Sequence, residues 1–250
     1  MVTLSGENPR YGYRRAWALL RRKGWSVNKK RVHRLWREER LKVPEKQRKR
    51  RRLAEGKSEN GCARRKAQYK NHVWSYDDFV MDRTEDGRRL KMMPVVDEYT
   101  RECLSIEVER STTAEAVVGT LATLLWERGE PAFIRSDNGP EFVAVALRRS
   151  WLEASEVGTL YIEPGSPWEN AYSESFIGRF GDELLKWEEF ASQLEAKVLV
   201  EEYRQHYNHR RPHSTLGYQT PSEFAAESSV SKDVAPEGCE KELESAPILS

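Results

Sequence analysis

The sequence predicts an α/β protein whose main domain is a mixed sheet built in the order β-β-β-α-β-α-β-α, preceded by a small all-α helix-turn-helix domain. Charge divides the chain. Residues 1–70 hold 24 of the 42 Lys and Arg and 6 of the 40 Asp and Glu, which leaves 18 basic and 34 acidic residues for 71–250. Hydrophobic periodicity changes at the same place, from helical spacing to strand alternation. We therefore expect two domains, the first with the charge of a phosphate-backbone binder.

Residues 1–42 are predicted to form the helix-turn-helix segment. The stretch 11–23 has apolar residues at helical spacing and is followed by Gly24, which is typical of a helix C-cap. Asn28 can cap a second helix that runs to about Leu41. The apolar residues are Tyr13, Trp17 and Leu20 in the first helix and Val32, Leu35 and Trp36 in the second.

Basic side chains surround both apolar stripes. In a helix-turn-helix the second helix enters the major groove, so these side chains are candidates for contact with DNA. The pattern leaves an alternative open, which is a pair of amphipathic helices whose basic faces only meet water. The candidate DNA-binding residues are Arg14, Arg15, Lys29, Lys30, Arg31, Arg34 and Arg37.

Residues 43–70 are predicted to form a basic linker, because the apolar pattern stops and Lys, Arg, Gly and Ser dominate. Such a segment tracks phosphates or stays mobile.

Residues 71–226 are predicted to form the α/β domain. Strands at 72–81, 90–97 and 102–109 follow one another as an antiparallel meander, and the third is expected to alternate strictly between its two faces. Pro94 inside the second strand indicates an edge or a bulge. The following elements are a helix at 112–129, a strand at 132–137, a helix at 141–154, a strand at 159–164 and a helix at 170–185.

The end of the chain is predicted to be a helix at 190–209, a proline-punctuated segment, and a disordered tail at 227–250 that is rich in Ser, Glu, Lys and Pro. The expected apolar side of the helix comprises Leu194, Val198, Val200 and Tyr203. A basic aromatic cluster follows it, formed by His206, Tyr207, Asn208, Arg210, Arg211, Pro212 and His213. This cluster is expected to contact a DNA backbone or another subunit, or else to cap the helix end with solvated arginines.

Composition excludes several classes of protein. No stretch approaches the roughly 20 apolar residues of a membrane helix, and the first ten residues do not resemble a signal peptide, so a cytoplasmic protein is expected. Cys62, Cys103 and Cys239 are odd in number and far apart, which argues against a disulfide framework or a cysteine zinc site. Zinc is not expected at the three histidines of 206–213 either, because no cysteine or further histidine lies nearby.

Carboxylates are the candidate catalytic groups. Asp77 and Asp78 interrupt an apolar strand, and at most one of them can line a given site because neighbouring strand residues point to opposite faces. Asp137 ends a strand at the carboxyl edge of the sheet, where open α/β sheets bind ligands. Glu174 lies one turn into a helix that Asn170 can cap. Taken singly, each acid is better explained as a turn, first-turn or strand-edge residue without a catalytic role.

Three carboxylates can share a site only if cations neutralise them. Oxygen ligands without cysteine or histidine favour Mg²⁺ or Mn²⁺ over Zn²⁺. Two such ions roughly 3.5–4 Å apart clamp the attacking and leaving oxygens of a phosphodiester displacement. Together with the basic helices upstream, the carboxylates predict metal-dependent chemistry on nucleic acid.

Five strings of this sequence carry a family resemblance. WSYDDFV, VVDEYTREC, IRSDNGPEF, PGSPWENAYSESF and YNHRRPHSTLGYQTP resemble the catalytic half of bacterial insertion-sequence transposases of the retroviral-integrase-like, OrfB type. RYGYRRAWALLRRKGWSVNKKRVHRLWREERL resembles the helix-turn-helix segment that precedes that core. The resemblance spans about residues 9–226. It implies a ribonuclease-H-like fold whose active site holds two aspartates and a glutamate.

Matched position by position, the resemblance makes Asp137 the second aspartate and Glu174 the glutamate. The first aspartate is Asp77 when the match is counted from the left and Asp78 when it is counted from Phe79; we favour Asp78, because this keeps the Asp-Phe-Val string intact. The interval between Asp137 and Glu174 is one residue longer than is usual in the family, and the extra residue is assigned near Ser150. Such insertions are expected to flip a strand or rotate a helix unless a bulge absorbs them.

The resemblance implies a transposase that binds the terminal inverted repeats of its element, cleaves a DNA 3′ end and joins it to target DNA with about two Mg²⁺ or Mn²⁺ ions. It also implies a homo-oligomer on DNA, an upstream-frame DNA-binding partner and a place in the bacterial nucleoid. Further expected roles are DNA contact by Arg210 and Arg211 and shaping of the site by Asn138, Gly139, Trp168 and Asn170.

Two other functions fit the same residues. One is a truncated or insertion-disabled DNA-binding remnant without catalysis, in which the N-terminal helices act alone. The other is a metal-dependent nuclease that cuts DNA without joining ends.

Overall fold

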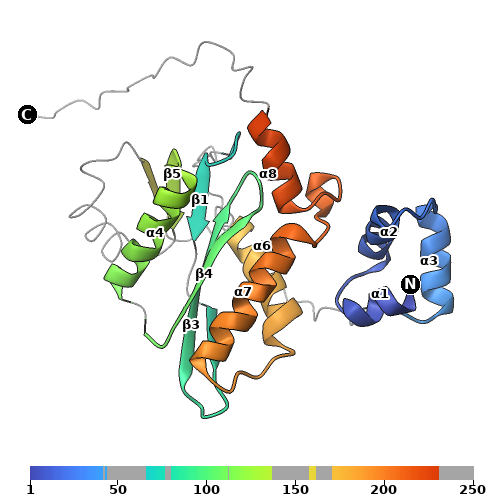
Figure 1. The fold of residues 1–250 in the computed structure, drawn as a ribbon, viewed down its shortest axis with the longest axis horizontal. Helices are drawn as coiled ribbons and strands as arrows, with labels where there is room; N and C mark the ends of the chain where they lie inside the picture. The colour runs from blue at the N-terminus through green and yellow to red at the C-terminus, as the bar shows by residue number, and fades with distance from the viewer. Residues whose placement is uncertain are drawn as a thin grey trace, which may run out of the picture.

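The computed structural model describes residues 1–41, 43, 66–76, 80–111, 113–136, 158–161 and 171–230. Figure 1 shows an N-terminal unit of three helices beside a core in which helices cover a mixed sheet. The helices of the N-terminal unit are α1 (Val2–Glu7), α2 (Tyr13–Arg22) and α3 (Lys29–Glu38).

The N-terminal unit confirms both predicted helices. The chain leaves α2 through Gly24, whose φ of 84° is left-handed, and the amide of Trp25 returns a hydrogen bond to the carbonyl of Leu20. The side chain of Asn28 caps α3 by accepting a hydrogen bond from the amide of Lys30 at 2.9 Å. The short helix α1 was not predicted, because its six residues show no full apolar repeat.

The core sheet combines an antiparallel and a parallel half. β3 (Arg89–Asp97) is antiparallel to β4 (Cys103–Glu109) on one side and to β1 (Val73–Tyr76) and β2 (Val80–Arg83) on the other. β1 continues the sheet in parallel to β5 (Phe133–Ser136), which pairs in parallel with β6 (Gly158–Tyr161). The sheet matches the predicted ribonuclease-H-like order.

The strand predicted at 72–81 is in fact two strands with different registers. Tyr76 of β1 pairs with Val95, and Val80 of β2 pairs with Met92. Three residues therefore lie between Tyr76 and Val80, whereas only two lie between their partners Met92 and Val95 on β3. The ladder shifts by one residue, as it does at a β-bulge.

The pairing of β3 with β4 contains a second irregularity. The register shifts between Val95 and Val96, so Leu104 lies with the cluster under α4, while Ile106 and Val108 lie with the cluster on the other face. The predicted strict alternation of the third strand is therefore wrong at this bulge. Pro94 lies on an inner strand, which rules out the edge position, and it stands opposite the break between β1 and β2, in keeping with the predicted bulge.

Helices cover both faces of the sheet. α4 (Ala114–Arg128) packs on a face that includes Trp74 and Tyr76. The opposite face is covered by α6 (Ala171–Phe180) and α7 (Gln193–His209), and Phe176 and Phe180 of α6 lie at its centre. The remaining elements are the π-helical turn η2 (Gly181–Leu185), the 3-10 turn η3 (Ser214–Leu216) and α8 (Pro221–Val230).

The buried side of α7 differs from the prediction. Val200 and Tyr203 are buried as expected, but Leu194 and Val198 are 72% and 51% exposed. The buried stripe instead continues toward the end of the helix through Tyr207. It lies there because α7 crosses the sheet over β4, where the aromatic side chains of α6 meet it.

The predicted helix at 141–154 and nearly all of the predicted linker lie outside the described residues. So does the chain beyond 230, although α8 itself extends three residues past the start of the predicted tail. Within the described parts of the chain, no helix combines the length and the apolar character needed to cross a membrane.

Candidate active site

Two neighbouring parallel strands end at the same edge of the sheet. β1 ends at Tyr76 and β5 ends at Ser136, with Ser75 directly opposite Arg135. In the sequence, Asp77 and Asp78 follow the first strand and Asp137 follows the second. The carboxyl ends of adjacent parallel strands are the usual position of a ligand site in an open α/β sheet.

A buried hydrogen bond holds the first turn of α6 against this part of the sheet. The hydroxyl of Ser173 donates to the hydroxyl of Ser75 at 2.9 Å, and neither side chain is exposed to solvent. Ser75 in turn donates to the carbonyl of Val96 at 3.5 Å. One turn further on, the buried ring of Phe176 anchors the helix in the core.

Glu174 follows Ser173 directly and is exposed. Among the described residues, no cation forms an ion pair with its carboxylate. Adjacent helix positions are turned by about 100°, so Glu174 lies on a flank of α6 next to the side on which Ser173 contacts β1. The predicted glutamate is therefore a solvent-accessible carboxylate carried on a rigid element.

The other predicted site residues lie outside the described residues. These are Asp77, Asp78, Asp137, Asn138, Gly139, Ser150, Trp168 and Asn170. Within the described ranges no cluster of three His, Cys, Asp or Glu could hold a metal. Glu174, which has no ion-pair partner among the described residues, offers the kind of oxygen ligand that a hard divalent ion such as Mg²⁺ takes.

A buried ion pair that the sequence did not predict joins β5 to the residue after β3. Arg135 of β5 donates to both carboxylate oxygens of Glu98 at 2.9 and 3.2 Å, and both side chains are almost fully buried. Asp97 beside it accepts hydrogen bonds from three backbone amides; burial raises the pKa of its carboxyl group, and these bonds oppose the shift. The signal was present in the sequence, because two acids follow an apolar strand in VVDEYTREC.

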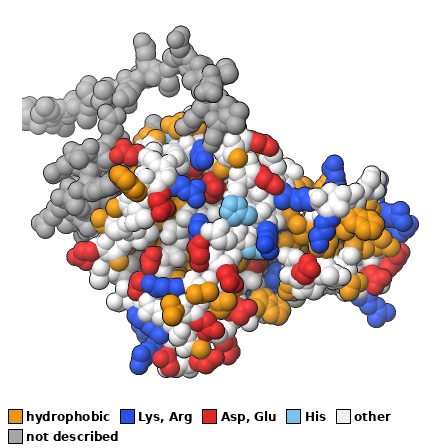
Figure 2. Space-filling view, in the orientation of Figure 1, with side chains coloured by type: hydrophobic (Ala, Val, Ile, Leu, Met, Phe, Trp, Pro, Cys, Tyr) orange, Lys and Arg blue, Asp and Glu red, His pale blue; other side chains and the backbone are white. Residues whose placement is uncertain are grey.

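The predicted DNA-binding residues of α3 form an exposed basic face. Trp36 and Val32 turn inward, and the basic side chains stay in solvent. Figure 2 shows Lys and Arg side chains around the outer edge of the N-terminal unit, whereas Asp and Glu are scattered over the core. The exposed residues are Lys29, Lys30, Arg31, Arg34 and Arg37, together with Arg14 of α2 and Arg210 after α7.

Arg15 and Arg211 lie elsewhere. Arg211 is 1% exposed and donates two hydrogen bonds of 2.8 Å to Glu183 of η2. Arg15 pairs with the same carboxylate at 3.2 Å. The expectation of solvated arginines at the end of α7 therefore holds for Arg210 but not for Arg211, which is part of the core.

His213 lies near these arginines and is buried. Burial, and to a smaller extent the neighbouring charges of Arg179, Arg211 and Arg101, lower the pKa of its imidazole to about 3. The ring is therefore neutral, and its Nδ1 lies 2.8 Å from the hydroxyl of Thr215.

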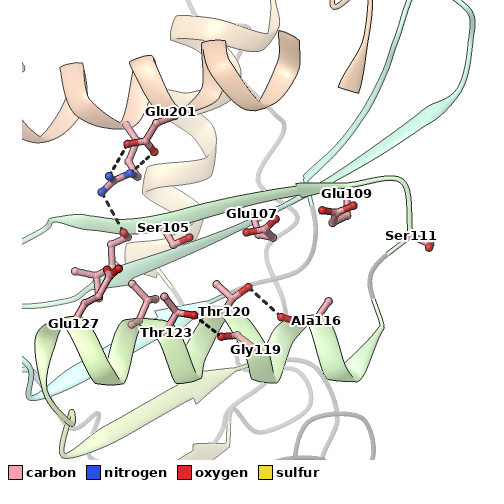
Figure 3. A pocket seen from close by; sticks show the side chains of 13 residues that line it. Ser105, Glu107, Glu109, Ser111, Ala116, Gly119, Thr120, Thr123, Glu127 and Glu201 are labelled. Carbon is pink, nitrogen blue, oxygen red and sulfur yellow. Dashed lines mark hydrogen bonds and ion pairs between the residues drawn. The ribbon is translucent and has the colours of Figure 1, made fainter. Parts of the chain in front are cut away.

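A cavity of about 580 Å³ lies at the β4 edge of the sheet, away from these strand ends. Figure 3 shows it between β4, α4 and α7, with Glu107, Glu109, Glu127 and Glu201 around it. Lys197 and Arg204 pair with three of these acids. Its lining does not include Glu174, so it is not the site that the sequence predicts.

Family models match most of the chain. A model described as an integrase core domain matches residues 67–167, a second model with the same description matches residues 155–221, and one described as an HTH-like domain matches residues 5–51. These ranges coincide with the core and the N-terminal unit.

Individual proteins are similar along most of their length. The uncharacterized 31.7 kDa protein of insertion element IS407 from Burkholderia multivorans is 40% identical over 233 residues, which cover 93% of this chain and 82% of that protein. The transposase InsD of insertion element IS2D from Escherichia coli is 29% identical over 237 residues, covering 88% and 74%. Among solved structures, the HTLV-2 integrase catalytic core domain in complex with magnesium has a TM-score of 0.50 at 14% identity and covers 64% of this chain and 99% of that one.

Proposed function

Because the chain belongs to the integrase-core family of insertion-element transposases, we propose that it binds the ends of an insertion element, cleaves DNA 3′ ends and transfers them to target DNA. The observation that carries the proposal is the position of Glu174. Its helix is fixed by Ser173 to β1, beside the edge where β1 and β5 each end next to an aspartate in sequence. This arrangement supports the proposal that two aspartates and the glutamate meet at one edge of the sheet.

The first aspartate is proposed to be Asp78. Val80 pairs with Met92 on the face covered by α6, so alternation back from β2 assigns position 78 to that face. Alternation forward from Ser75 assigns position 77 to it instead, because the register shifts by one residue between the two ladders. β2 still pairs with β3 although one extra residue precedes it. Single substitutions of Asp77 and Asp78 decide which of them is the first aspartate.

Asp78, Asp137 and Glu174 are proposed to hold two Mg²⁺ or Mn²⁺ ions, which supply charge neutralisation and activation of oxygen in phosphodiester displacement. The solved HTLV-2 neighbour is a complex with magnesium, which agrees with this choice. The remaining residues of the site are proposed to position these carboxylates. Ser173 and Ser75 hold the glutamate, and Asn138, Gly139, Trp168 and Asn170 are proposed to shape the loops around it.

The exposed basic face of α3 is proposed to bind the terminal inverted repeat. Lys29, Lys30, Arg31, Arg34 and Arg37 are available in solvent, and each phosphate contact adds to the salt dependence of binding. Arg14 and Arg210 are proposed as further backbone contacts. We assign Arg15 and Arg211 no DNA contact, because Glu183 already binds both.

The active form is proposed to be a homo-oligomer assembled on paired DNA ends and target DNA. A DNA-binding partner from an upstream reading frame is part of the same proposal.

The experiment that tests this function follows a labelled oligonucleotide that carries the end of the element, with and without Mg²⁺. Cleavage and joined products in the natural chain, both absent in Asp137→Asn and Glu174→Gln, are the expected result. Cleavage without joined products would favour the nuclease. Binding of the end without any product would favour the non-catalytic remnant.

Removal of single residues completes the test. If the natural chain is silent and deletion of Asp77 or Ser150 restores activity, the chain is a transposase disabled by one-residue insertions.

A further inference from the structure

The N-terminal unit docks on the core through a junction of charged residues. We call Arg10, Arg15, Asp182, Glu183 and Arg211 the Glu183 junction. Glu183 accepts two hydrogen bonds of 2.8 Å from Arg211 and one of 3.2 Å from Arg15. Arg10 pairs with Asp182 at 3.3 Å.

The carboxylate of Glu183 is charged within the junction. Burial by itself would raise its pKa, but the hydrogen bonds and charges of Arg211 and the charge of Arg15 outweigh burial and lower it. Tyr11 packs against the junction, because the guanidinium of Arg15 lies 5.0 Å from the centre of its buried ring. Residues 168 positions apart in sequence are therefore joined by a half-buried ion pair.

Further contacts extend the docking along α2. Arg22 donates to the carbonyl of Tyr218 at 3.1 Å and pairs with Glu223 of α8. The ring of Trp17 meets Tyr218 edge-on at 5.7 Å between ring centres. α2 thus lies on the core, while α3 packs on α2 through Tyr13 and His33 and keeps its basic face exposed.

The same helical segment carries both the glutamate of the site and the junction. α6 begins at Ala171 and η2 follows it directly at Gly181. Glu174 and Glu183 are nine residues apart, roughly 13 Å along a helix axis. The π-helical turn that ends this helical segment holds both acids of the junction.

We propose that the Glu183 junction fixes the distance between α3 and Glu174, so that Arg10, Arg15 and Glu183 are positioning residues that set where the enzyme cuts relative to the sequence it binds. The inference rests on the proposed function. Misplacement of a reacting group by about 1 Å can cost roughly a hundredfold in rate, so a loosened junction should slow cleavage and scatter its position.

The test uses the full chain with Arg10→Gln and Arg15→Gln combined. Glu183→Gln is less suitable, because it would leave Arg211 buried without its carboxylate. The control combines Arg21→Gln and Arg40→Gln. It removes the same charge from exposed positions, and the guanidinium of Arg21 lies over Trp17 of its own unit.

Three readouts separate positioning from stability. X-ray scattering without DNA should show a larger radius of gyration for the Arg10/Arg15 variant than for the control. The Kd for the end should stay within about threefold of the control, because α3 is intact. Cleavage should fall about tenfold or more, with cuts at several positions instead of one.

An unchanged radius of gyration would overturn the inference, whether or not the chain cleaves DNA. An expanded variant that cuts at the natural position and rate would overturn it as well. If the natural chain binds an end without cutting, the proposed catalysis fails separately, and a DNA footprint replaces the cleavage readout. The footprint of the variant should then be shorter than that of the control, and equal footprints would refute positioning.

Discussion

Ser173 donates a hydrogen bond of 2.9 Å to Ser75, and this contact joins the first turn of α6 to the strand that ends beside the aspartate pair. Both hydroxyls are fully buried, so neither can exchange its partner for water. The contact positions Glu174 through its neighbour in the helix. The sequence alone identifies Glu174 only as an acid in the first turn of a helix; the contact shows that this turn is fixed to β1.

Removing one of these hydroxyls should destabilise the protein. Ser75→Ala leaves the Ser173 hydroxyl buried without an acceptor, which costs about 1–3 kcal/mol of unfolding free energy in urea denaturation. The double variant Ser75→Ala/Ser173→Ala should recover part of that loss, because no polar group is then left unpaired. Ser175→Ala, on the exposed side of α6, should change the free energy by less than about 0.5 kcal/mol. An equal loss in the single and double variants would contradict the role of the pair.

The buried pair of Glu98 and Arg135 should be sensitive to loss of one charge. Glu98→Gln removes one charge of this buried ion pair, and the expected loss of unfolding free energy is about 3–5 kcal/mol. Glu38→Gln breaks the exposed pair with Arg34 and is the control, with an expected change under about 0.5 kcal/mol. Equal losses of unfolding free energy from both substitutions would contradict a larger contribution of the buried Glu98–Arg135 pair.

Stability should depend on pH through His213. Its pKa is lowered to about 3 in the folded chain and is about 6.5 in an unfolded one, so the unfolded state binds more protons between these values. Stability from this group is present above pH 6.5 and is lost as the pH falls, at up to about 1.4 kcal/mol per pH unit. Urea titrations at pH 7, 6 and 5 should show a shallower decline for His213→Gln. Parallel declines would contradict a buried neutral ring.

The register shift predicts how the chain responds to losing one residue. Deleting Asp77 leaves two residues between β1 and β2, which equals the two residues between Met92 and Val95 on β3. A bulge is then no longer needed. The deleted chain should therefore fold with an unfolding free energy equal to or above that of the natural one. A large loss of stability would mean that the extra residue is required by the sheet.

The fold could be predicted from the sequence because the signals that indicate its elements are local. The turn at Asp86 and Gly87, the caps at Gly24 and Asn28 and the periodicity of α4 each depend on a few adjacent residues. The sequence also identified Glu174 correctly as an acid in the first turn of α6. The positions of Asp78 and Asp137 remain predictions.

What the sequence did not reveal depends on contacts between distant residues. The exposed Leu194 and Val198 are as apolar as the buried Val200, and only the path of α7 over β4 separates them. Arg15 and Arg211 look like DNA contacts in the sequence, and their shared partner Glu183 is revealed only by folding. The one-residue register shift between β1 and β2 likewise depends on how both strands pair with β3, which the sequence around Asp77 and Asp78 does not determine.

The central claim is that Glu174 acts with the two aspartates on DNA, and single-turnover cleavage of an element end in Mg²⁺ tests it most directly. Glu174→Gln should cleave at least about a thousandfold more slowly than the natural chain, at equal affinity for the end and equal stability. Glu188→Gln, an exposed acid after η2, should cleave at the natural rate. Cleavage by Glu174→Gln within about threefold of the natural rate would contradict the account.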